Sequence, residues 1–186
     1  LEAARENALT FLKSLPDVEV IGPDHMLTLE GEAIELLEQF EKDRPDLLIT
    51  HFMTFSLGVV PPMFAQRLNV PVVLWSMKEP DPKGGRLQNN SFCAANMNAH
   101  HMYRLHIPYF HVHAEPGTSD AAEKITKVVN TAKAMKALRE MRVGLIGGRV
   151  PGFYTSCVSE MLLRRCLGPE VKIITEHELF TCAQHL

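Results

Sequence analysis

Short apolar runs alternate with helical segments along the chain, and this alternation limits the possible folds more than any other feature. Runs typical of buried strands occupy residues 18–22, 46–50, 70–75, 109–113, 142–147 and 171–175. The segments between them predict helices over residues 1–15, 31–42, 61–69, 91–105, 120–139 and 155–167. Strands that alternate with helices in this way favour an α/β fold, with a parallel sheet covered on both faces.

The order of elements predicts a doubly wound, flavodoxin-like parallel sheet in residues 1–140 and the start of a second α/β domain in residues 141–186. The first predicted element is a helix, whereas the first strand of such a sheet usually lies near its middle. Without that strand its neighbours would bury unpaired backbone groups, at about 1–3 kcal/mol each. We therefore expect a further strand before residue 1. We also expect the second domain to be truncated, since a βαβ unit of about 45 residues does not bury a core alone.

Charge and hydropathy exclude several classes of function. The net charge is −3, no Lys/Arg run suggests a nucleic-acid partner, and no apolar stretch approaches the roughly 20 residues that span a membrane. The four cysteines follow no metal-ligand spacing, which favours reduced thiols in a cytoplasmic protein.

Two loops leave the carboxyl ends of predicted strands, where parallel sheets hold their ligands. The first runs from Ser76 to Asn90, after the strand that ends at Trp75, the only tryptophan. The second, residues 147–153, does not follow the GxGxxG pattern, which disfavours dinucleotide binding. His111 and His113 share one strand face, but no third metal ligand stands at a compatible spacing. We interpret them as strand-end or subunit-interface groups.

The run WSMKEPDPKGGRLQNNSFCAANMNAHHMYRLHIPYFHVHAEP, followed by a long helix and RVGLIGGRVPGFYTS, resembles the N-terminal domains of the L-fucose/L-arabinose isomerase superfamily. The resemblance implies two N-terminal α/β domains, a C-terminal domain and a homo-oligomer. It also implies interconversion of an aldose and its ketose with a divalent metal, usually Mn²⁺. The Glu, Asp and His ligands of that metal would come from regions absent from this chain. We therefore expect no catalytic or metal-binding residue here, and an inactive fragment.

In such enzymes the first domain contributes a wall of the sugar pocket, often that of a neighbouring subunit. By resemblance, Trp75 would stack on the sugar, Asn90 would face its hydroxyls, and the loop residues Pro151, Gly152 and Phe153 would lie beside it. Each residue has a plainer reading: a core aromatic for Trp75, a helix cap for Asn90 and a tight turn for the loop. Arabinose isomerases carry a histidine where this chain has Cys93, and this difference argues against L-arabinose as the substrate.

The sequence leaves other functions open. A two-lobed sugar-binding module without chemistry, of the periplasmic receptor or repressor kind, would share this alternation of strands and helices. A nucleotide-binding or signalling domain would need a phosphate loop or acidic residues at its strand ends, which the sequence lacks at Thr50-His51 and Trp75-Ser76. We expect a monosaccharide substrate, either a pentose or a deoxyhexose.

Overall fold

The computed structural model describes residues 1–56, 58–81 and 84–184, which divide into two compact units, Leu1–Ala132 and Lys133–Leu186. Residues 82 and 83 of the predicted polar loop lie outside the described residues. The first unit holds, in chain order, α1 (Glu2–Lys13), α2 (Glu30–Asp43), β1 (Leu48–Phe52), α3 (Val60–Leu68), β2 (Val72–Ser76), α4 (Ser91–Arg104), β3 (Tyr109–His113) and the start of α5 (Ser119–Glu140). The second unit takes the end of α5 and then β4 (Arg142–Ile146), η1 (Tyr154–Ser156), α6 (Glu160–Cys166), β5 (Glu170–Ile174) and α7 (Glu176–Gln184).

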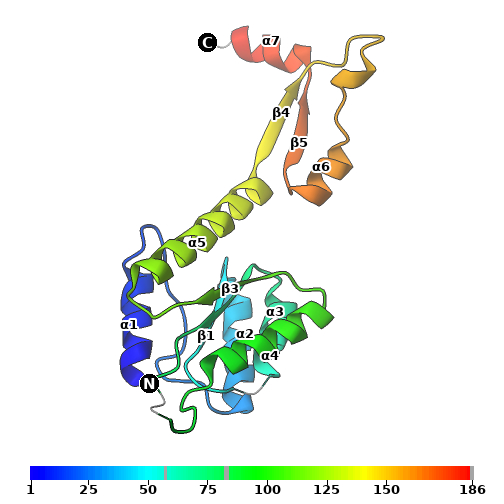
Figure 1. Cartoon of the computed structure of the whole chain (residues 1–186). Helices are drawn as coiled ribbons and strands as arrows, with labels where there is room; N and C mark the ends of the chain where they lie inside the picture. The colour runs from blue at the N-terminus through cyan, green and yellow to red at the C-terminus, as the bar shows by residue number, and fades with distance from the viewer. Residues whose placement is uncertain (57, 82–83, 185–186) are drawn as a thin grey trace. The chain divides into compact units, whose positions relative to one another are not determined.

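All strand pairs in both units are parallel among the described residues, and helices connect the strands (Figure 1). The first sheet has the order β1-β2-β3, with Leu48 opposite Val72 and Val72 opposite Tyr109. The second sheet pairs β4 with β5. The predicted α/β class with parallel sheets is therefore confirmed. The predicted domain boundary between residues 140 and 141 falls at the end of α5, whereas the compact units divide inside that helix.

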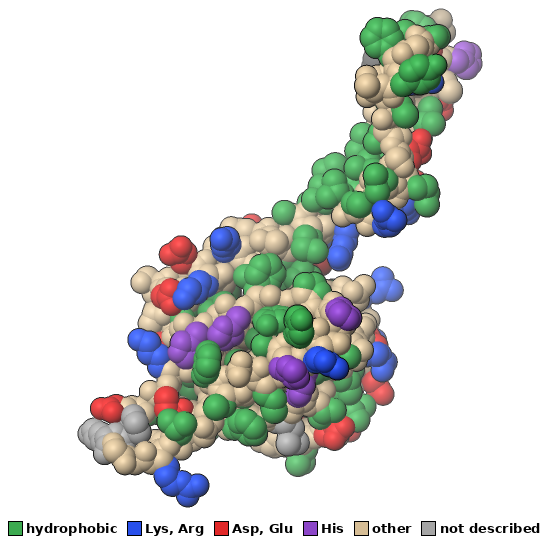
Figure 2. All heavy atoms as spheres, turned by 45° about the vertical axis from the view of Figure 1, so that its right-hand side comes forward, with side chains coloured by type: hydrophobic (Ala, Val, Ile, Leu, Met, Phe, Trp, Pro, Cys, Tyr) green, Lys and Arg blue, Asp and Glu red, His purple; other side chains and the backbone are tan. Residues whose placement is uncertain are grey.

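The second unit keeps much of its apolar surface exposed. All five residues of β4 are exposed, including Val143 and Leu145, and so is Ile173 on β5. Figure 2 shows green hydrophobic side chains over much of the visible surface of this unit. A two-stranded sheet has too few neighbours to cover such side chains, so this unit gains little stability from burial.

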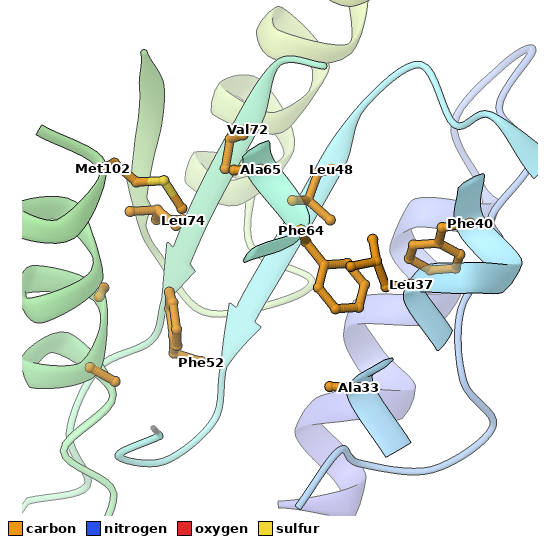
Figure 3. Packing of buried hydrophobic residues seen from close by; sticks show 12 residues of the cluster. Ala33, Leu37, Phe40, Leu48, Phe52, Phe64, Ala65, Val72, Leu74 and Met102 are labelled. Atoms are coloured by element: carbon orange, nitrogen blue, oxygen red, sulfur yellow. The ribbon is translucent and has the colours of Figure 1, made fainter. Parts of the chain in front are cut away.

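The core of the first unit lies on both faces of its sheet. On one face, Leu48, Phe52, Val72 and Leu74 pack against side chains of α2, α3 and α4, including Leu37, Phe64 and Met102 (Figure 3). On the other face, Val73, Trp75 and Val112 pack against α1 and α5. All five residues of β2 are buried, as expected for the central strand of a sheet with helices on both sides.

Two predicted elements differ from the structure. Residues 18–22 form no strand, although Val18 and Val20 are half-buried against the same cluster as Ile49. The alternation of apolar and polar residues in 18–22 correctly indicated one buried face. These residues do not form a strand beside β1, however, because β1 pairs only with β2 among the described residues. The predicted helix 155–167 begins later, at Glu160, because the Ser159 hydroxyl accepts the backbone N–H of Leu162 and caps α6.

Candidate functional site

The carboxyl ends of β1, β2 and β3 meet at one edge of the first sheet. Ser76, the last residue of β2, lies opposite Phe52 on one side and His113 on the other. Because the strands are parallel, the segments that leave them all start at this edge, where open α/β sheets bind ligands. This edge, with the first turn of α4 beside it, is the candidate site.

Ser91, the first residue of α4, ties this edge together. Its buried hydroxyl donates to the Phe52 carbonyl at the end of β1 and accepts the backbone N–H of Met77 at 2.9 Å, just after β2. One side chain therefore satisfies two backbone groups on neighbouring strands and holds α4 against both.

Ser91→Ala should lower the free energy of unfolding by about 2 kcal/mol, because it leaves buried backbone groups of Phe52 and Met77 unpaired. Urea unfolding followed by circular dichroism measures this loss. Ser14→Ala is the control, because the Ser14 hydroxyl is exposed where it donates to the Phe11 carbonyl. An equal, small loss in both variants would contradict the structural role of Ser91.

Glu79 folds the loop after β2 back on itself. Its carboxylate accepts the backbone N–H groups of Gln88, of Asn89 at 2.7 Å and of Asn90 at 2.8 Å. These hydrogen bonds, that of Asn89 first, lower the pKa of Glu79. Next to it, the Lys78 N–H donates to Glu115, which follows β3, at 2.7 Å. The two carboxylates fix the loop relative to α4 and β3.

Ser76, His111 and His113 form a polar cluster on the α4 side of the sheet. The Ser76 hydroxyl lies 3.2 Å from Nε2 of His111 and 2.9 Å from Nδ1 of His113. The ring of Phe92, on the first turn of α4, lies edge-on to both imidazoles, with centroids 5.8 and 5.3 Å away. Sequence analysis noted the two histidines but missed Ser76 and Phe92, whose proximity depends on strand register and on the position of α4.

Trp75 is buried in the core, with no exposed surface. Its indole N–H donates to the Ala114 carbonyl at 2.9 Å, and its ring packs against Phe11 and stacks on His51. In this unit Trp75 has no free face for a sugar, so its position supports the reading as a core aromatic.

Asn90 lies where a ligand could reach it. It precedes α4 in a left-handed conformation, with φ of 55°, which asparagine tolerates better than most residues. Its side chain is half-buried and makes no capping hydrogen bond, so its amide is not used as a helix cap. Cys93, one turn into α4, is exposed.

Pro151, Gly152 and Phe153 form an exposed turn after β4, in the second unit. Gly152 has φ of 84°, a conformation that favours glycine, and the Phe153 N–H donates to the Val150 carbonyl at 3.1 Å. The Phe153 side chain is 62% exposed. The turn therefore presents one large apolar side chain to solvent.

Within the part of the chain that the structure describes, no group of three or more His, Cys, Asp or Glu side chains could hold a metal ion. The residues present thus do not fit the divalent metal that the resemblance implies. The same described residues include no helix long and apolar enough to cross a membrane.

Comparison with known proteins gives this edge a family context. Residues 2–139 match the model of the fucose/sulfoquinovose isomerase N-terminal domain. A sulfoquinovose isomerase of Priestia aryabhattai is 27% identical over 179 residues, which cover 96% of this chain and 40% of that protein. A sulfoquinovose isomerase of Alkalicoccus urumqiensis is 28% identical over 140 residues, covering 75% of this chain and 31% of that protein. A third, from Clostridium sp. (strain MSTE9), is 26% identical over 179 residues.

The chain spans about two fifths of the length of the first of these relatives. The family match covers all of the first unit except Leu1, including all three strands of its sheet and the polar edge. The chain therefore belongs to the fucose/sulfoquinovose isomerase family and carries its N-terminal domain.

Proposed function

We propose that the full-length protein is an aldose–ketose isomerase, an intramolecular oxidoreductase that acts on a sulfonated or unsubstituted 6-deoxyhexose. The observation that carries this proposal is the family match over residues 2–139, together with relatives that are all named sulfoquinovose isomerase. Sulfoquinovose, a sulfonated 6-deoxyglucose, comes first among the substrates to test. A pentose is less favoured, because Cys93 replaces the histidine of the arabinose isomerases.

Such an isomerase moves a proton between C1 and C2 of an open-chain sugar, which requires a base and a group that stabilises the enediol oxyanion. A bound divalent metal, Mn²⁺ in our proposal, supplies Lewis-acid stabilisation. We propose that its ligands and the base belong to parts of the protein outside this chain. Residues 1–186 alone would then bind the sugar and shape its pocket without catalysing the isomerisation.

The first unit would form one wall of the sugar pocket. Asn90 supports this role, because its amide is not used for capping and offers both donors and acceptors to hydroxyls. We propose separately that Pro151, Gly152 and Phe153, in the second unit, contact the sugar in the full-length protein through the exposed Phe153 side chain. Trp75 would hold the sheet edge in place from within the core.

We further propose that the full-length protein is a cytoplasmic homo-oligomer in which a neighbouring subunit shares the pocket. The outer side of α4 supports a subunit contact. An open hollow there is lined by Met97, His100, Tyr103 and Tyr109 among others, and Tyr103 is 73% exposed. Exposed aromatic residues of this kind are enriched at interfaces.

The test is turnover by the full-length protein with Mn²⁺, using sulfoquinovose, L-fucose and L-arabinose and detecting the ketose by NMR. We expect turnover of at least one 6-deoxyhexose, its loss with EDTA and its return with added Mn²⁺. Residues 1–186 alone should show no turnover. Absence of ketose from every sugar would refute the isomerase proposal.

A further inference from the structure

Glu79 makes a set of hydrogen bonds that neither the family match nor the isomerisation step explains. Its carboxylate accepts three successive backbone N–H groups, those of Gln88 and Asn89 on Oε1 and that of Asn90 on Oε2. These bonds, that of Asn89 first, lower the pKa of Glu79, so the side chain is a charged acceptor at neutral pH. One carboxylate therefore determines the path of the backbone as it enters α4.

The backbone that carries Glu79 is itself held at the sheet edge. Two residues separate Glu79 from the end of β2, and the N–H group of each has a partner on another segment. The Met77 N–H donates to the Ser91 hydroxyl at 2.9 Å, and the Lys78 N–H donates to the Glu115 carboxylate at 2.7 Å. Glu79 thus reaches the chain ahead of α4 from a fixed point on the sheet.

Asn90 is held in an uncommon backbone conformation by bonds on both of its sides. Its N–H donates to Glu79 at 2.8 Å, and its carbonyl accepts the N–H of Ala94 at 3.1 Å. The φ and ψ angles of Asn90 are 55° and 27°, in the left-handed region. An asparagine before a helix usually adopts an extended conformation instead and caps the helix with its side chain. Among the described residues the Asn90 side chain makes no such bond, so its amide is available to a ligand.

Removal of the Glu79 carboxylate would release this constraint. Asn90 could then adopt the extended conformation of an ordinary helix cap, and its side chain would accept N–H groups of the first turn of α4. The new cap would offset part of the stability lost with Glu79, but the amide would be occupied. Glu79 therefore decides between two uses of the same amide, a helix cap or a ligand contact.

We propose that Glu79 is a positioning residue that keeps the Asn90 amide free to bind a sugar hydroxyl away from C1 and C2. This inference rests on the proposed function, in which Asn90 lies in the wall of the sugar pocket. A hydroxyl that takes no part in the reaction is bound equally in the ground state and in the transition state. Loss of its partner therefore raises KM and leaves kcat unchanged.

The experiment is a double-mutant cycle on KM and kcat of the full-length protein with Mn²⁺, using sulfoquinovose, or L-fucose if that is the sugar turned over. Asn90→Gly removes the amide and suits a φ of 55°. Glu79→Gln keeps the size of the side chain, but its NH₂ group cannot accept an N–H. Each variant should raise KM about tenfold, the value of one hydrogen bond, at nearly unchanged kcat. The double variant should also raise KM about tenfold, because both changes remove the same contact.

Glu32→Gln is the matched control and should leave KM unchanged. The Glu32 carboxylate likewise accepts backbone N–H groups, those of Thr28 and Leu29, ahead of a different helix, α2. Urea unfolding establishes that each variant is folded. If Glu79→Gln does not fold, Glu79→Asp replaces it in the cycle with the same expected KM, because the shorter side chain cannot reach all three N–H groups.

The outcomes separate the two proposals. An unchanged KM in the folded Glu79 variant, or single effects that multiply to about a hundredfold in the double variant, would overturn the positioning role alone. An unchanged KM in Asn90→Gly would overturn the positioning role and the place of Asn90 in the pocket wall, while the isomerase proposal would stand. Absence of ketose from every sugar with the wild type would overturn the isomerase proposal and this inference with it.

Discussion

Trp75→Ala should destabilise the first unit by about 3–5 kcal/mol, the largest effect that we expect from a single substitution. The indole is fully buried, contacts Phe11 and His51, and donates to the Ala114 carbonyl at 2.9 Å. Its removal would open a large cavity and leave a buried carbonyl unpaired. Since domains are typically stable by only 5–15 kcal/mol, such a loss is a large share of the total. Urea unfolding at neutral pH measures it.

Trp75→Phe is the matched variant, because it keeps an aromatic ring while it removes the N–H and part of the ring volume. It should cost less than Trp75→Ala, about 1–3 kcal/mol, for the unpaired Ala114 carbonyl and the smaller cavity. In the full-length protein this variant should leave KM for the sugar unchanged if Trp75 serves only the core. A raised KM with unchanged stability would show instead that the indole reaches the substrate.

The wild type should lose up to about 3 kcal/mol of stability between pH 6.5 and pH 4 through His51 alone. Burial lowers the pKa of His51 from 6.5 to about 4, and its Nε2 is buried with no hydrogen-bond partner among the described residues. A folded-state pKa below the unfolded value means that the neutral form is favoured on folding. The contribution is therefore complete above pH 6.5 and is lost as the pH falls toward 4.

His51→Phe should flatten this pH dependence, since phenylalanine keeps the stacking on Trp75 and cannot be protonated. Urea unfolding of both proteins from pH 7.5 to pH 4 gives the two curves. His100→Gln, at an exposed position on α4, should leave the wild-type slope unchanged. Parallel curves for the wild type and His51→Phe would contradict a buried neutral His51.

Most of the fold could be predicted from the sequence where a strand is apolar throughout or ends at clear breakers. Residues 109–113 form β3 with the predicted bounds, and the apolar run before Ser76 is the fully buried β2. Residues 18–22 could not be judged in the same way. Their alternation of apolar and polar residues is explained by the packing of Val18 and Val20 against the core. A strand also needs a hydrogen-bonded neighbouring strand, and the local sequence does not specify one.

The candidate site was only partly predictable, for a related reason. The run ending at Trp75 is apolar on both faces, so its sequence locates the strand end without showing which side chains reach the surface. The spacing of His111 and His113 places them on one face, yet the groups that meet them come from elsewhere. Ser76 arrives through strand register and Phe92 through the packing of α4. Neither relation is local in sequence.

The free side of β1 has a practical consequence for handling this chain. Among the described residues β1 pairs only with β2, so the outer row of its backbone N–H and C=O groups has no strand beside it. The side chains of Leu48 and Phe52 are buried, which holds this strand in place against the core. An ordered, unpaired strand edge is a template on which a second polypeptide can add a strand. Preparations of residues 1–186 should therefore aggregate with rising concentration, starting at β1 and before any helix melts.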